Sequence, residues 1–151
     1  PEVSLSAMAA TGREIIWGSP TAPRAEVIGG FAVLVLITLI TTVATNSLGT
    51  DHPVRRFFYD VGLPVILFYA PGAAAAVGTY LRCGAVTCLV VGLIPAAFFV
   101  AVAVVGSTVG APGVGGGDAP LWSITLAFAT ISMISAGVGF VAGVVVSTVG
   151  R

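Results

Sequence analysis

The chain has 151 residues, of which 57% are hydrophobic and only 8% are charged. Soluble globular domains carry about 25% charged residues, so this chain has too little charge to cover a water-facing surface. Its six basic and six acidic residues cancel, which leaves no electrostatic reason to expect nucleic acid as a partner. The composition therefore predicts an integral membrane protein, with the lipid bilayer as its first partner.

The first 25 residues form a separate N-terminal segment in this prediction. The stretch VSLSAMAATGREIIW is compatible with a short helix at the membrane interface, and WGSPTAP follows as a linker. Pro23 suits the first turn of the helix that comes next. A secretory signal peptide is the weaker alternative, because the apolar segment begins late and lacks a small-x-small cleavage site.

Four uncharged runs follow, and a membrane-spanning helix needs about 20 apolar residues. The third run is too long for one helix, but from Gly106 it becomes rich in glycine, which is typical of a flexible loop. Residues 26–151 are thus expected to form one transmembrane domain. The fold class is an all-α membrane protein, a four-helix transmembrane bundle with up-and-down connections. The predicted spans are about 26–47, 58–81, 83–105 and 120–148.

Threonines line one face of the first predicted span. Thr38, Thr41, Thr42 and Thr45 are spaced i, i+3, i+4 and i+7, which places them on one side of a helix. We expect their hydroxyl groups to bond to carbonyls one turn earlier while the face packs against a neighbour. The alternative is a polar wall that lines a pathway for water or a small neutral solute.

The connection GTDHPVRRFFYD, residues 49–60, holds the single histidine of the chain. His52 lacks the companions that metal binding or catalysis needs, so we interpret the stretch as a turn and membrane anchor. A ligand or partner epitope at His52 is the alternative. Aromatic and arginine side chains mark both membrane interfaces. The predicted anchors are Trp17, Arg55, Arg56, Phe57, Phe58, Tyr59, Tyr80 and Trp122.

Prolines lie near the midpoints of the second and third spans, at Pro71 and Pro95. Proline removes a backbone donor and clashes with the preceding turn, so both helices are expected to kink. Paired interruptions also occur in transporter sites, and here such a site would include Tyr69. Simple packing kinks are favoured. A third alternative makes the second span a re-entrant hairpin broken at Pro71-Gly72, which would leave three full spans.

The last span has the most regular pattern. Ser135, Gly139, Gly143 and Ser147 recur every four residues and therefore share one helix face. Small side chains let a second helix approach closely, which predicts a helix-packing face. The pattern does not say whether the partner lies in the same chain or in another subunit.

Side chains that could carry out catalysis or bind a metal are scarce in the predicted spans. The four uncharged runs argue against a proton-coupled pump and a voltage sensor. No His, Cys, Asp and Glu cluster has metal-ligand spacing, and no nucleophile sits beside a base. Cys83 and Cys88 point away from each other on a helix, and GVGGGD lacks the residues of a phosphate loop. We therefore expect no enzyme activity, no metal and no cofactor.

Arginine counts predict the orientation. Arg13, Arg24, Arg82 and Arg151 fall on one side and Arg55 and Arg56 on the other, which favours a multi-pass cell-membrane protein with both termini in the cytoplasm. The use of arginine without lysine suggests a GC-rich prokaryotic genome. The sequence favours a structural, assembly or accessory subunit that associates with other membrane subunits or with itself. The alternative is a minimal channel or permease for a small neutral or weakly polar solute.

Overall fold

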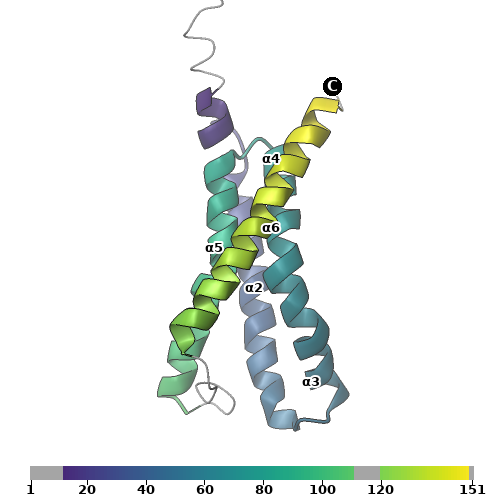
Figure 1. The fold of residues 1–151 in the computed structure, drawn as a ribbon, viewed down its shortest axis with the longest axis vertical. Helices are drawn as coiled ribbons and strands as arrows, with labels where there is room; N and C mark the ends of the chain where they lie inside the picture. The colour runs from purple at the N-terminus through teal and green to yellow at the C-terminus, as the bar shows by residue number, and fades with distance from the viewer. Residues whose placement is uncertain (1–11, 111–119, 150–151) are drawn as a thin grey trace, which may run out of the picture.

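The computed structural model describes residues 12–110 and 120–149. Within these ranges the chain forms helices and no strands, and four of the helices are long and apolar enough to cross a membrane (Figure 1). The prediction of an all-helical chain with four apolar helices is confirmed. The four helices are Arg24–Leu48, Pro53–Tyr80, Ala85–Thr108 and Leu121–Val149.

Two of these helices are composite. The first consists of α2, Arg24–Thr45, and a short 3-10 turn, Asn46–Leu48. The second consists of α3, Pro53–Phe57, two π-helical segments and α4, Ala70–Tyr80. The π-helical segments are Phe58–Gly62 and Val65–Tyr69. The third and fourth helices are α5, Ala85–Thr108, and α6, Leu121–Val149.

The second helix begins at Pro53, earlier than the predicted start at residue 58. Proline at the first helical position needs no N–H partner and has a suitable φ. The side chain of His52 caps this start, because its Nδ1 accepts a hydrogen bond from the Val54 N–H at 3.3 Å. Arg55 and Arg56 therefore lie in the first turns of the helix and not in the connection.

The second helix continues through the Pro71-Gly72 step, so the structure does not support the re-entrant hairpin. Its backbone widens before the proline, where the Ala70 N–H bonds to the Val65 carbonyl five residues earlier. Such π-turns are a known way for a helix to absorb an irregular residue. Pro95 behaves differently, because α5 remains α-helical on both sides of it.

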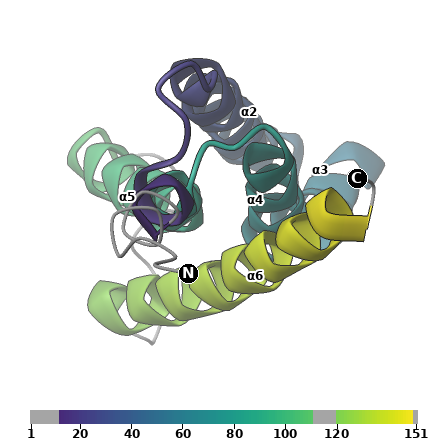
Figure 2. The ribbon, with the colours of Figure 1, turned by 90° about the horizontal axis from the view of Figure 1, so that it is seen from above.

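The last helix lies across the middle two. α6 packs obliquely on α4 and α5, while α2 lies on their opposite side and packs chiefly on α5 (Figures 1 and 2). Buried apolar side chains from the first three long helices form the larger core cluster. Its members are Phe31, Val35, Leu39, Ile66, Leu67 and Val91. A smaller cluster of Ala75, Cys88 and Ala136 joins α4, α5 and α6.

The N-terminal segment packs against the connection between α4 and α5. Residues 12–17 are helical, and the Ser19 N–H then donates to the Arg82 carbonyl at 2.8 Å. Gly18 and Gly84 both have positive φ, and a Cβ on Gly84 would lie 2.8 Å from the Ile16 carbonyl oxygen. Only glycine allows so close an approach in this conformation. Residues 1–11 of the predicted interfacial segment lie outside the described residues, as do residues 111–119 of the predicted glycine-rich loop.

Candidate functional site

At Pro71-Gly72 the backbone of the second helix lacks some of its own hydrogen bonds, and two serines of α6 replace them. Because Pro71 has no N–H, the Leu67 carbonyl loses the donor that an α-helix would give it. The Ser132 Oγ donates to this carbonyl at 2.7 Å, and the Ser132 side chain is fully buried. One turn on, the Gly72 N–H donates to the Ser135 Oγ at 3.1 Å. Hydroxyl groups of α6 therefore satisfy the backbone on both sides of the break.

Glycines of α6 make this contact possible. Gly139 is buried so closely against Gly72 that a Cβ on it would collide with the Gly72 carbonyl. A Cβ on Gly143 would lie 2.7 Å from the Thr79 Cβ and 2.8 Å from the Ala76 carbonyl oxygen. The partner of Ser135, Gly139 and Gly143 is thus the second helix of the same chain.

Ser147, the fourth residue of the predicted packing face, is placed differently. It is half-buried, and its Oγ donates to the Val144 carbonyl of its own helix at 2.8 Å. The close contact between α4 and α6 therefore involves the first three residues of the face.

Small side chains of α5 complete the same junction. A Cβ on Gly92 would lie 2.8 Å from the Met133 Sδ and 3.2 Å from the Ala136 Cβ. The Cys88 Sγ lies 3.5 Å from the Thr79 Oγ1 and 3.6 Å from the Ala75 carbonyl. Three helices thus meet with little space between their backbones.

The threonine face of α2 uses its hydroxyl groups internally. The four side chains donate to the carbonyls of Leu34, Ile37, Thr38 and Thr42, at 2.9, 2.7, 2.8 and 2.8 Å in chain order. Thr42 and Thr45 are buried, whereas Thr38 and Thr41 are half-buried. The hydroxyl donors are thus used within α2, which is the arrangement expected for a packing face.

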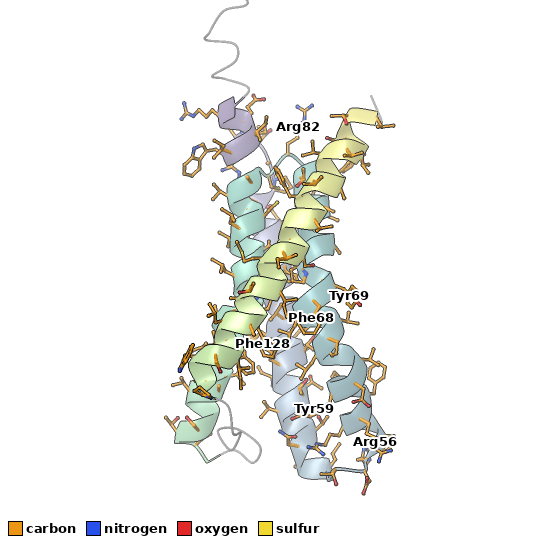
Figure 3. All side chains as sticks on the ribbon, in the orientation of Figure 1. Arg56, Tyr59, Phe68, Tyr69, Arg82 and Phe128 are labelled. Atoms are coloured by element: carbon orange, nitrogen blue, oxygen red, sulfur yellow. The ribbon has the colours of Figure 1, made fainter. Side chains whose placement is uncertain are left out.

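The Tyr69 side chain is placed differently from the two prolines of the predicted pathway. Pro71 and Pro95 are both fully buried. Tyr69, in contrast, is 71% exposed and points outward from the second helix (Figure 3). The structure therefore does not bring Tyr69 to the prolines. Among the described side chains, no buried nitrogen or oxygen atom lacks a hydrogen-bond partner.

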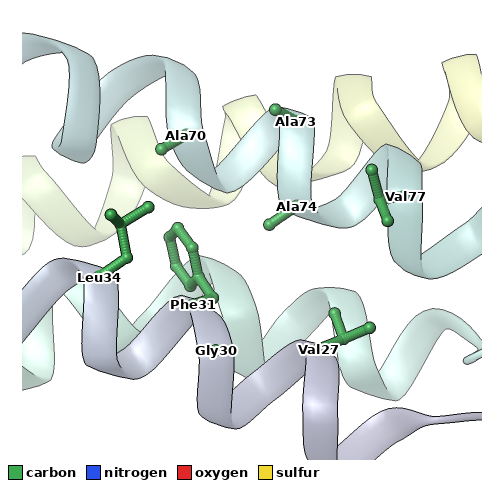
Figure 4. A pocket seen from close by; sticks show the side chains of 8 residues that line it. All are labelled: Val27, Gly30, Phe31, Leu34, Ala70, Ala73, Ala74 and Val77. Atoms are coloured by element: carbon green, nitrogen blue, oxygen red, sulfur yellow. The ribbon is translucent and has the colours of Figure 1, made fainter.

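An apolar groove separates α2 from α4 (Figure 4). Its cavity volume is about 340 Å³, and none of the predicted pathway residues lines it. A Cβ added to Gly29 or Gly30 would meet nothing within 4 Å. The groove is lined by Val27, Gly30, Phe31, Leu34, Ala70, Ala73, Ala74 and Val77.

The predicted anchors lie toward the ends of the long helices. Trp17, Phe57, Tyr80 and Trp122 are exposed, and Phe58 is half-buried with its ring edge-on to Phe57 at 5.8 Å. In Figure 3, Arg82 lies at one end of the molecule and Arg56 and Tyr59 lie at the other. This distribution is compatible with two membrane interfaces.

The two cysteines are free and buried. Burial raises the pKa of the Cys83 thiol, and the nearby Arg24 opposes part of this rise. Within residues 12–110 and 120–149, no group of three His, Cys, Asp or Glu side chains is arranged to hold a metal ion. Because its pKa is raised, the Cys83 thiol is neutral at neutral pH.

No protein-family model matches the chain, and comparisons with curated proteins and with solved structures give no match. The site must therefore be interpreted from its own geometry. Sequence reasoning missed Ser132, Leu67 and the groove. A signal for the first two was present, because a proline at position 71 frees the carbonyl of residue 67, and Ser132 shares a helix face with Ser135.

Proposed function

We propose that this protein is a non-catalytic structural or assembly subunit, an accessory component that holds a transmembrane helix of another subunit. The observation that carries the proposal is the apolar groove between α2 and α4. This groove is open along the side of the bundle and contains glycine and alanine where two helices could have closed together. The proposal includes an up-and-down arrangement in the cell membrane with both termini in the cytoplasm.

The chemistry of the groove fits an apolar helix with small residues. Within a bilayer, helices associate through close packing, and small side chains let their backbones approach. Gly30, Ala73 and Ala74 provide such a surface, and no charged side chain lines the groove. Gly139 and Gly143 of α6 cannot serve this purpose, because the second helix already covers them. We therefore propose α2 and α4 as the assembly surface.

The channel or permease alternative has weaker support. The four threonine hydroxyl groups donate within α2, and the apolar groove lies between α2 and α4 without any of these threonines in its lining. Flux of a neutral solute into proteoliposomes, above the rate for empty liposomes, would favour this alternative over the assembly role.

The test compares two exposed glycines after gentle purification from native membranes. Gly30→Leu places a large side chain in the groove, whereas Gly137→Leu places one on α6, where a Cβ also meets nothing within 4 Å. We expect an unlike membrane subunit to purify with the unmodified chain and with Gly137→Leu. Gly30→Leu should recover about tenfold less partner, equivalent to a loss of about 1.4 kcal/mol in binding.

Thermal stability in detergent provides the control, and we expect all three proteins to unfold at similar temperatures. Equal partner recovery with Gly30→Leu would contradict the placement of the surface. Recovery of the unmodified chain as a monomer alone, by native mass measurement, would contradict the assembly role itself.

A further inference from the structure

A second, polar cavity lies at the other end of the second helix. It is lined by Thr50, Arg55, Arg56, Tyr59 and Asp60 and has a volume of about 230 Å³. Thr50 lies in the turn between α2 and α3 and the other four residues follow it, at the end of the molecule where Figure 3 labels Arg56 and Tyr59. The exposed Phe57 of the same turns is suited to the membrane interface. The cavity thus lies at the end of a candidate membrane span, where lipid headgroups would be expected.

Arg55 is held in a fixed orientation. Its Nε donates to the Asn46 Oδ1 at 3.2 Å, and the Tyr59 hydroxyl donates to the same oxygen at 2.8 Å. The Arg55 guanidinium lies 5.0 Å above the centre of the Tyr59 ring. A guanidinium fixed at Nε and on one face still offers its terminal N–H groups as a planar fork.

Arg56 adds a second, more weakly held positive charge. Its Nη2 lies 2.8 Å from the Asp51 Oδ1, and the two side chains are 63% and 90% exposed. Ion pairs this exposed are worth about 0–1 kcal/mol and exchange readily with other partners. Asp60 contributes one carboxylate to the same cavity. The cavity therefore combines two cations with an acceptor.

We propose that this cavity binds a phospholipid headgroup. The phosphate is taken by Arg55 and Arg56, because guanidinium groups match phosphate oxygens in charge and in geometry. Asp60 accepts a hydrogen bond from a donor next to the phosphate, so it selects a headgroup that carries an ammonium or hydroxyl group. This inference does not depend on the proposed assembly role, since it concerns the opposite end of the second helix.

The ligand comparison uses phosphatidylethanolamine and phosphatidylcholine with identical acyl chains. Both headgroups are zwitterionic, but the methylated ammonium of phosphatidylcholine has no N–H to donate. Lipid retention by the full chain in detergent is measured by native mass spectrometry. We expect phosphatidylethanolamine to be retained about ten- to a hundredfold better, the value of one charge-assisted hydrogen bond. Equal retention of the two lipids would overturn the proposal.

Variants assign the effect to residues. Arg55→Gln and Arg56→Gln should each lower retention of phosphatidylethanolamine, and Asp60→Asn should abolish the preference between the two lipids. Arg82→Gln, at the other end of the molecule, is the matched control and should bind as the unmodified chain does. Should Arg55→Gln fail to fold, Arg56→Gln and Asp60→Asn still decide, and unchanged binding in both would overturn the proposal.

Inorganic phosphate distinguishes the two sources of the anion. At equal concentration it should not displace the lipid, because it has no acyl chains and no ammonium group, and its negative charge is repelled by the Asp60 carboxylate. Displacement by inorganic phosphate would assign the cavity to a free anion and would overturn the lipid inference.

Discussion

The two sides of the second helix differ sharply although both are rich in small residues. On the α6 side, Gly139 lies against Gly72 with no room for a methyl group. On the α2 side, Gly30 faces an open groove. Small residues are therefore not sufficient to bring two helices together.

Polar backbone groups account for the difference. The α6 side carries the Leu67 carbonyl and the Gly72 N–H, and both find partners in Ser132 and Ser135. Within a bilayer, no water is present to pair with an unbonded backbone group. The contact that supplies the missing hydrogen bonds is therefore strongly favoured. The α2 side offers almost only apolar atoms to the groove, and lipid chains satisfy these about as well as another helix does. The comparison indicates that the proline break decides which side closes.

The largest effect is expected for Gly139→Leu. The new side chain meets the rigid Gly72 backbone, so α4 and α6 must separate and their hydrogen bonds lengthen. We expect a loss of about 3 kcal/mol in the free energy of unfolding. Unfolding by a denaturing detergent, followed by circular dichroism, measures it.

Gly137→Leu is the control on the same helix and should change stability by less than about 0.5 kcal/mol. If the two leucine variants were equally stable, the tight α4–α6 contact described here would be wrong.

A smaller effect is expected for Ser132→Ala, which leaves the Leu67 carbonyl without its donor. The expected cost is about 1–2 kcal/mol, since an unmade buried hydrogen bond costs about 1–3 kcal/mol in water-soluble proteins and less in membranes. Ser147→Ala should be near neutral, because its hydroxyl bonds only within α6.

Pro71→Ala sharpens this test, because alanine restores a backbone N–H that can reach the Leu67 carbonyl. In that background, Ser132→Ala should cost much less. A double-mutant cycle measures the coupling, and strict additivity would show that the serine does not compensate for the proline.

The smallest effect on stability is expected for the ionisation of Cys83, which lies in the connection just beyond α4. Its raised pKa means that the folded chain favours the neutral thiol. The corresponding stability is complete below the ordinary thiol pKa and is lost as the pH rises through the folded value.

In a Cys88→Ala background, maleimide should therefore label folded Cys83 slowly near neutral pH. Labelling should become faster at alkaline pH or after unfolding. Rapid labelling of the folded protein at neutral pH would contradict the burial of Cys83.

The helices were largely predictable because uncharged runs mark apolar segments directly. The start of the second helix was not, because Arg55, Arg56 and Asp60 made its first turns resemble a connection, although Pro53 and His52 form an ordinary helix start. The face of α6 was visible as a four-residue repeat. Its partner was not, because helical periodicity carries no information about pairing between residues more than 60 positions apart. The groove between α2 and α4 could not be predicted either, because a space between two helices produces no periodic pattern in the sequence.

The serine contacts also constrain how the chain is made. Leu67 and Gly72 depend on residues that follow them by 65 and 63 positions. During synthesis, the second helix therefore enters the bilayer before its partners exist, with a carbonyl that its own backbone cannot satisfy. The hydrogen bonds of the second helix can be completed only after the last helix has been inserted. A chain truncated before α6 would keep this defect exposed to lipid, where a quality-control protease or chaperone could detect it.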